Sequence, residues 1–141
     1  MKIAIINGPN LNLLGTREKD IYGEESFGAI IDRLSTLFPE FEIIYHQSNI
    51  EGEIINILHS SALKCNGIVL NAAGYTHTSV SIADAVKAVE VPVVEVHISN
   101  ILAREEFRHN SLISPGCAGS IFGFGTEGYR LALEYFRNNN K

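Results

Sequence analysis

Glu95 and His97 stand out because they interrupt an apolar segment, PVVEVH, over residues 92–97. Side chains alternate across a β-strand, so this spacing directs both to one face. A carboxylate beside an imidazole selects the ring tautomer and favours the protonated ring, which suits a general acid. The alternative is a buried pair that only satisfies its own hydrogen bonds.

A second candidate pair, Arg17 and Tyr22, lies in the glycine-flanked segment NGPNLNLLGTREKDIYG, residues 7–23. An ordinary tyrosine has a pKa near ~10, and lowering it to ~7 to 8 takes about 3 to 4 kcal/mol. One guanidinium at ~4 Å, in an effective dielectric of ~20, supplies about 4 kcal/mol before the phenolate is desolvated. The pair therefore suggests a phenolate base, and the alternative is an ordinary loop tyrosine.

His77, in YTHTS, has two interpretations. It is either a functional residue or part of a helix cap with Thr78 and Ser79. A metal site built from His77, Glu95 and His97 is a further alternative, but the fixed H-x-E-x-x-H type of spacing is missing, so we expect no metal.

Strands and helices alternate along the whole chain. Continuous β-branched runs predict strands over residues 2–6, 41–47, 67–71, 92–97 and 119–124. Helical periodicity falls between them, over residues 26–38, 52–64, 79–89 and 127–137. This order predicts an α/β fold of one domain, residues 1–141: a flavodoxin-like, doubly wound, five-stranded parallel sheet in the order 2-1-3-4-5 with helices on both faces.

In such a sheet, ligands bind at the carboxyl ends of the strands, near the point where the strand order reverses. We therefore expect the polar residues after strands 1, 3 and 4 to converge there: Asn10, Arg17, Tyr22, Asn71, His77, Glu95, His97 and Ser99. Arg104 and Arg108 follow, four residues apart, and share one face if that segment is helical.

The composition of the chain narrows the range of possible binding partners. The formal net charge is −5 and the pI about 5.5, which argues against nucleic acid. No run approaches a signal peptide or a membrane span, so we expect a cytoplasmic protein that binds no membrane. The two cysteines are far apart and indicate a reducing compartment.

GFGTEG, residues 123–128, fits the G-x-G-x-x-G pattern. A dinucleotide fingerprint needs a further strand and an acidic residue ~20 positions on, and the chain ends 13 residues after Gly128. We interpret these glycines as a tight turn with close helix packing.

The motifs INGPNLNLLGTRE, IYG, QSNIEGEI, LNAAGYTHTS, EVHISN, AREEFRHNS and GYRLAL run in this order along the chain. With them the chain closely resembles the type II 3-dehydroquinate dehydratases of the shikimate pathway. The resemblance implies a flavodoxin-like hydro-lyase without a cofactor. It also implies anti elimination of water from 3-dehydroquinate, through an enolate, to give 3-dehydroshikimate.

Transferred to matching positions, the resemblance makes Tyr22 the base, with its pKa lowered by Arg17, and His97 the acid, positioned by Glu95 and Asn71. The remaining implied roles are a water held by Asn10, the substrate carboxylate bound by Ile98 and Ser99, and ring hydroxyls bound by His77 and Arg108. Family members form dodecamers, tetramers of trimers, with an aspartate at the position of Asp84 entering the neighbour's site. In this reading the segment with Arg17 and Tyr22 is a lid.

Two alternatives come from other classes of protein. One is a flavodoxin-like module that binds a flavin or a nucleotide, and the other is a structural subunit whose rim residues mediate contacts between copies. The lysines argue against a Schiff base, because only Lys19 lies near the expected site.

Overall fold

The computed structural model describes residues 1–16, 20 and 25–139. Its sheet has five parallel strands in the order β2-β1-β3-β4-β5. In chain order the strands are β1 (Lys2–Asn7), β2 (Glu42–Gln47), β3 (Gly67–Asn71), β4 (Val93–His97) and β5 (Gly119–Phe122). The predicted strand order is confirmed. The order reverses between β1 and β3, and Asn7 and Asn71 are paired at the carboxyl ends of these two strands.

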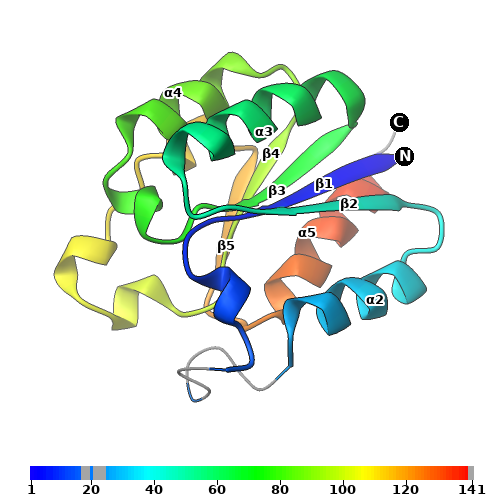
Figure 1. Cartoon of the computed structure of the whole chain (residues 1–141), viewed down its shortest axis with the longest axis horizontal. Helices are drawn as coiled ribbons and strands as arrows, with labels where there is room; N and C mark the ends of the chain where they lie inside the picture. The colour runs from blue at the N-terminus through cyan, green and yellow to red at the C-terminus, as the bar shows by residue number, and fades with distance from the viewer. Residues whose placement is uncertain (17–19, 21–24, 140–141) are drawn as a thin grey trace.

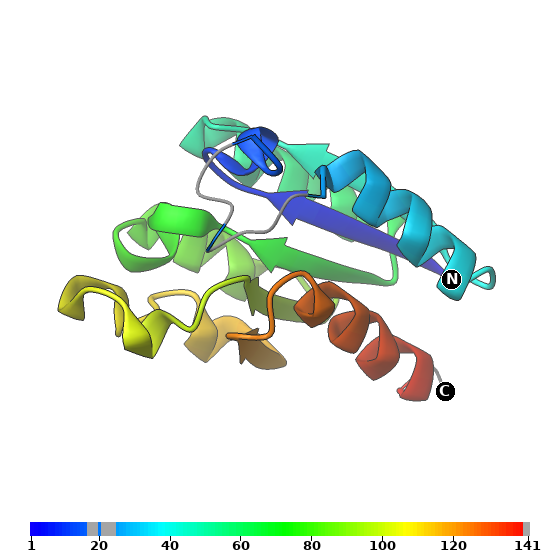
Figure 2. The same cartoon turned by 90° about the horizontal axis from the view of Figure 1, so that it is seen from below.

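Helices cover both faces of the sheet, as predicted (Figures 1 and 2). In chain order they are α2 (Phe27–Leu37), α3 (Glu51–Lys64), α4 (Val80–Ala88) and α5 (Glu127–Asn138). In Figure 1, α3 and α4 lie on one face, and α2 and α5 lie on the other. Serine side chains cap two of these helices: Ser26 accepts a hydrogen bond from the Ala29 amide in α2, and Ser79 accepts one from Ile82 in α4.

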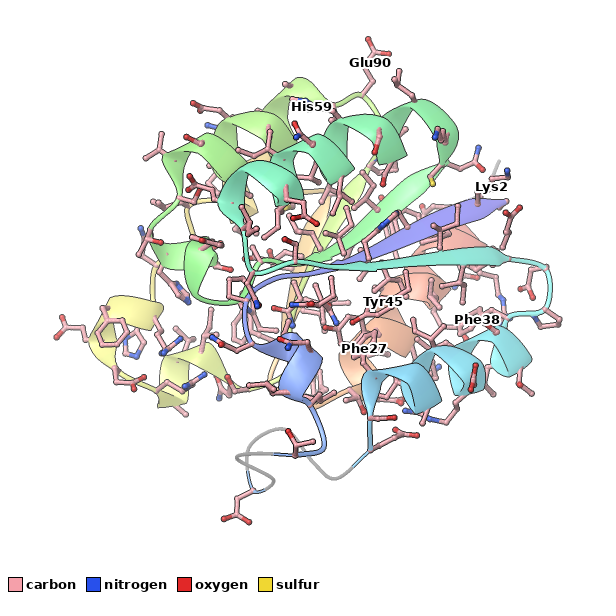
Figure 3. All side chains as sticks on the ribbon, in the orientation of Figure 1. Lys2, Phe27, Phe38, Tyr45, His59 and Glu90 are labelled. Carbon is pink, nitrogen blue, oxygen red and sulfur yellow. The ribbon has the colours of Figure 1, made fainter. Side chains whose placement is uncertain are left out.

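Because side chains alternate between the two faces of the sheet along the central strands, a hydrophobic core forms on each face. Ile3 and Ile5 of β1 pack with the apolar faces of α2 and α5, whereas Ala4 and Ile6 pack with those of α3 and α4. A sheet buried on both faces explains why its strands read as continuous apolar runs. Figure 3 shows Phe27, Phe38 and Tyr45 between the sheet and α2, and the rings of Phe27 and Tyr45 stack 4.8 Å apart.

The predicted boundaries are right to within one or two residues. The largest difference is at β5, which ends at Phe122 rather than residue 124. Gly123 follows with a φ of +96°, a left-handed conformation that stops the strand. Gly125 also has a positive φ, and a Cβ on Gly128 would lie 3.1 Å from Val96 Cγ1. The interpretation of GFGTEG as a turn with close helix packing is confirmed.

The segment after β4 is not the α-helix considered for Arg104 and Arg108. It forms two short 3-10 helices, η3 (Ile101–Ala103) and η4 (Glu106–Arg108). Asn100 begins η3 by accepting a hydrogen bond from the Leu102 amide, which competes with a continuous helix. Within the part of the chain that is described, no helix has the length and apolarity needed to cross a membrane.

Candidate active site

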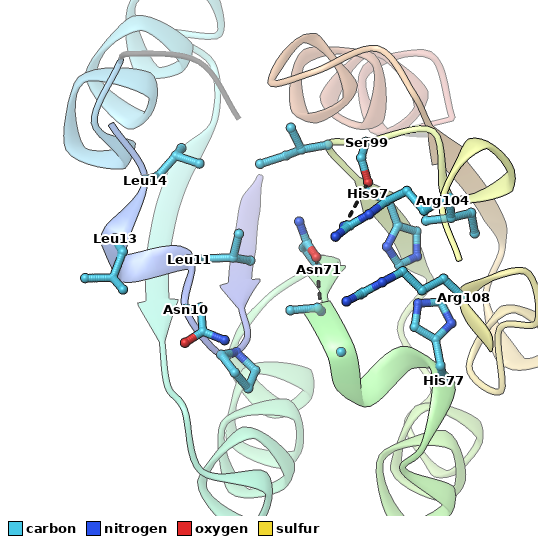
Figure 4. A pocket seen from close by; sticks show the side chains of 15 residues that line it. Asn10, Leu11, Leu13, Leu14, Asn71, His77, His97, Ser99, Arg104 and Arg108 are labelled. Atoms are coloured by element: carbon cyan, nitrogen blue, oxygen red, sulfur yellow. Dashed lines mark hydrogen bonds between the residues drawn. The ribbon is translucent and has the colours of Figure 1, made fainter. Parts of the chain in front are cut away.

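A pocket of roughly 200 Å³ opens at the carboxyl ends of β1, β3 and β4, where the strand order reverses (Figure 4). Three segments distant in the sequence line it: Pro9, Asn10, Leu11, Leu13 and Leu14 after β1; Asn71, Ala73, Gly74 and His77 at the end of β3; His97, Ile98, Ser99, Ile101, Arg104 and Arg108 at the end of β4. The leucines form an apolar wall opposite the basic and polar side chains. The fold thus collects most of the residues predicted to converge.

The central feature of the polar wall is His97, which is paired with Glu95 on β4 as predicted. His97 Nε2 lies 2.7 Å from Glu95 Oε2, and both side chains are nearly inaccessible to water. An ionised carboxylate only accepts hydrogen bonds, so Nε2 carries the proton of this bond. Nδ1 is therefore the imidazole nitrogen left for the pocket.

Glu95 is held as a carboxylate by three donors. His97 Nε2 and Ser111 Oγ donate to Oε2, the latter at 2.6 Å, and Ser120 Oγ donates to Oε1 at 2.5 Å. Burial by itself raises the pKa of the Glu95 carboxyl, but these hydrogen bonds outweigh burial and bring the pKa below its usual value. The charge beside His97 is thus present at neutral pH.

His77 lies beside His97 on the same polar wall, with its ring stacked at 6.2 Å from that of His97 (Figure 4). His77 Nδ1 donates to the Asn110 carbonyl at 2.9 Å, which leaves Nε2 unprotonated in the neutral ring. Burial lowers the pKa of His77, and the positive charges nearby act in the same direction. Ser79, not His77, caps α4, so the cap interpretation of His77 is wrong.

Two arginines bring positive charge to the pocket. Arg104 Nη1 donates to Ser99 Oγ at 3.4 Å, and Arg108 Nε donates to Glu105 at 2.8 Å. Arg108 was predicted as a binding residue. Arg104 was not, although its spacing from Arg108 in AREEFR was the available signal. The two guanidinium groups suit an anionic ligand.

The floor of the pocket is a buried polar chain. Asn71 Nδ2 donates to Tyr129 Oη at 2.9 Å, and Tyr129 donates to Asn7 Oδ1 at 2.7 Å. Asn71 Oδ1 accepts from the Ala73 amide at 3.1 Å. Asn71 was expected to position His97, but the hydrogen bonds of its side chain run to Tyr129 and Ala73. It does reach the pocket.

Two of the lining residues have left-handed backbones, Asn10 with φ +71° and Ala73 with φ +53°. Asparagine tolerates this region, whereas alanine pays a steric cost. Ala73 lies next to the Asn71 side chain that accepts its amide, so a strained residue is retained at the pocket wall.

The other predicted residues separate into three groups. Ile98 and Ser99 line the pocket beside His97, as expected of the strand end. Asp84 lies exposed on α4, outside the pocket of its own chain. Arg17 and Tyr22 lie outside the described residues.

Sequence reasoning missed the supporting residues. Ser111 precedes β5, Ser120 lies in β5 and Tyr129 in α5. Ser111 and Tyr129 fall within the motifs AREEFRHNS and GYRLAL, but nothing in their spacing showed that they support the pocket. Among the described residues no cluster of three or more His, Cys, Asp or Glu side chains could hold a metal. Burial raises the pKa of the Cys117 thiol to about 12, so it stays protonated and is a poor nucleophile.

Comparisons with known proteins all point to one family. Residues 1–137 match the family model described as dehydroquinase class II. The chain is 53% identical over 144 residues to a 3-dehydroquinate dehydratase of Clostridium perfringens (strain 13 / Type A), covering 100% of this chain and 99% of that protein. It is 50% identical over 137 residues to a 3-dehydroquinate dehydratase 2 of Pseudomonas aeruginosa, covering 95% and 92% of the two chains.

The fold agrees as well. The crystal structure of a type II dehydroquinase from Butyrivibrio crossotus aligns with a TM-score of 0.93 at 43% identity, covering 97% of both chains. Because the family model matches residues 1–137 and a relative covering the whole chain is 53% identical, the chain belongs to the dehydroquinase class II family.

Proposed function

We propose that this pocket dehydrates 3-dehydroquinate to 3-dehydroshikimate in the shikimate pathway. The base removes the proton beside the ketone and leaves an enolate. The enolate then expels the ring hydroxyl on the opposite face as water, with a proton from the acid. One water is lost and no electrons leave the substrate, so the step needs no redox cofactor.

His97 is the general acid of this proposal. The observation that carries it is the buried Glu95–His97 pair in the pocket wall, with Nε2 committed to the carboxylate at 2.7 Å. The carboxylate stabilises the imidazolium, and Nδ1 is the nitrogen free to deliver a proton. This arrangement supports a proton donor better than a merely satisfied buried pair, because Nδ1 has no hydrogen-bond partner among the described residues.

Tyr22 is the proposed base, and Arg17 lowers its pKa. Both assignments rest on the resemblance of GTRE and IYG to the family and on the electrostatic argument that one guanidinium supplies about 4 kcal/mol. A phenolate and an imidazolium on opposite faces of the substrate ring would satisfy the anti geometry. Tyr22→Phe should nearly abolish turnover and leave substrate binding largely intact.

The remaining pocket residues bind the substrate. We assign the substrate carboxylate to Ser99 and the backbone of Ile98, ring hydroxyls to His77 and Arg108, and an enolate-stabilising water to Asn10. Asn71 contributes the second hydrogen of its amide group, since the first is bound to Tyr129. The two arginines of the pocket support the choice of an anionic substrate. They place positive charge at the site, although the chain as a whole has a net charge of −5.

The decisive assay is incubation with 3-dehydroquinate and detection of the conjugated enone by its ultraviolet absorbance. His97→Ala should slow dehydration by about 10²- to 10⁴-fold. It should slow exchange of the abstracted proton with solvent much less, since that step belongs to the base. His59→Ala, an exposed histidine of α3, is the matched control. Equal losses of exchange and dehydration would argue against an acid role.

We further propose that the chain assembles as a dodecamer, a tetramer of trimers, in which Asp84 enters the site of a neighbouring copy. The support in this chain is an apolar surface around the pocket segment: Leu102, Phe107 and Phe124 are all more than half exposed. Light scattering should give twelve times the 15.5 kDa chain mass. A monomer with full dehydratase activity would refute both the assembly and the role of Asp84.

A further inference from the structure

Besides His97, the Glu95 carboxylate contacts two serine hydroxyls, and the proposed function gives these no role. The carboxylate is about 1% exposed, and its Oε1 faces Ser120 of β5, not His97. Its Oε2 is shared between His97 and Ser111. Two hydroxyl donors from separate segments therefore hold a buried anion that needs only one partner to orient the imidazole.

The directions of these bonds follow from chemistry. An ionised carboxylate cannot donate, so both Ser111 and Ser120 donate to it. Each hydroxyl has a single hydrogen, so the 2.9 Å contact between Ser114 and Ser120 has Ser114 as donor. Ser111 in turn accepts from the Ser114 amide at 3.1 Å. The serines form an oriented network that ends on Glu95.

We propose that Ser111 and Ser120 are positioning residues that hold Glu95 ionised and aimed at His97, and that they thereby limit how tightly the imidazole retains its proton. The inference rests on the proposed role of His97 as general acid. Neither serine lines the substrate pocket, so both act only through Glu95.

The serine hydroxyls change the distribution of charge on the Glu95 carboxylate. A carboxylate that accepts two hydroxyl hydrogen bonds has less negative charge to offer the imidazolium than one bound to histidine alone. Without a hydroxyl donor, Glu95 becomes more basic, His97 holds its proton to higher pH, and it becomes a weaker acid. The other titratable groups around the pair are His77 from the 3-10 helix η2 (Ala73–His77), Arg104 and Arg108 from the η3–η4 segment, His109 after η4, and Cys117 before β5.

The test compares Ser120→Val with Ser120→Thr. Both side chains are β-branched, suit a strand and have nearly the same volume, but only threonine keeps the hydroxyl. Valine also fills the space of the lost hydroxyl, because Glu95, Ser114 and Ser120 border a second hollow from which water could otherwise replace the donor. Ser120 lies at the exposed edge strand β5, so both variants are expected to fold.

In Ser120→Val the alkaline limb of the kcat profile should move up by about one pH unit, because a hydrogen bond to a charged group contributes roughly 1.5–3 kcal/mol and only part of it is transmitted. The kcat at neutral pH should fall by up to about tenfold with KM unchanged. Ser120→Thr should match the wild type, and Ser111→Ala should shift the limb in the same direction as Ser120→Val.

A spectroscopic readout separates this inference from the proposed function. Nitrogen NMR of the free protein should show the His97 ring with its proton on Nε2 when neutral. A proton on Nδ1 would overturn the inference whatever the activity. Superimposable profiles for Ser120→Val and Ser120→Thr, with His97→Ala still impaired, would overturn the inference alone. An active His97→Ala would instead overturn the proposed function.

Discussion

Tyr129→Phe tests the polar chain beneath the pocket. Tyr129 is fully buried in α5, and its hydroxyl is the link between two asparagines: it donates to Asn7 at 2.7 Å and accepts from Asn71 at 2.9 Å. The substitution removes one oxygen and keeps the ring, which packs edge-on against Phe27. It therefore isolates the two hydrogen bonds from the packing of the aromatic side chain.

The loss of stability in Tyr129→Phe follows from the polar groups that the substitution leaves buried without a partner. A buried group that loses its partner costs about 1–3 kcal/mol, and here one carbonyl oxygen and one amide hydrogen lose theirs. We expect the free energy of unfolding to fall by about 3 kcal/mol. With roughly 2.1 cal/mol/K of unfolding entropy per residue, a chain of 141 residues should lose about 10 °C in Tm.

The assay is urea denaturation and scanning calorimetry of the variant beside Tyr135→Phe. Tyr135 lies on the same helix but is 36% exposed, so its variant should differ from the wild type by less than about 0.5 kcal/mol. Tyr129→Phe should also bind substrate more weakly than the wild type, because the Asn71 amide loses the partner that orients it. Equal stabilities for the two variants would refute the reasoning.

Three further predictions concern the backbone around the pocket and its pH response. Ala73→Gly should stabilise the fold by up to about 1 kcal/mol in urea denaturation, because the left-handed penalty exceeds the entropy that glycine adds to the unfolded chain; a loss of stability would contradict the strain. Gly8→Ala should destabilise by more than about 2 kcal/mol, since its Cβ would lie 2.7 Å from the Ala72 carbonyl oxygen, whereas Gly28→Ala, with free space, should not. Burial lowers the pKa of His77 below 6.5, so the unfolded chain binds the proton more readily than the folded protein. Stability should therefore fall as the pH drops below about 6.5. His77→Gln should reduce this dependence of stability on pH, and an unchanged dependence in denaturation experiments would exclude His77 as its source.

The alternation of strand-like and helical segments was enough to predict the fold. Continuous apolar runs indicated strands buried on both faces, and the order β2-β1-β3-β4-β5 was predicted as the simplest flavodoxin-like winding of five parallel strands. The same reasoning located the pocket, because the carboxyl ends of parallel strands share one edge. Glu95 and His97 were found by their two-residue spacing, which is a local property of a strand.

Local patterns could not reveal which distant groups satisfy one another. The partner of Asn71 is Tyr129, 58 positions along the chain, and the donors to Glu95 come from 16 and 25 positions away. The segment with Arg104 and Arg108, considered only as a possible helix, forms two short 3-10 helices, because the Asn100 side chain accepts a backbone hydrogen bond.

The sequence by itself therefore determined the layered sheet, the edge where the pocket lies and the acid–base candidates on its rim, since all three depend on periodicities of a few residues. Only the tertiary structure decided the ionisation and tautomer of the Glu95–His97 pair. Those depend on hydrogen bonds from side chains that reach Glu95 only after β5 has packed beside β4.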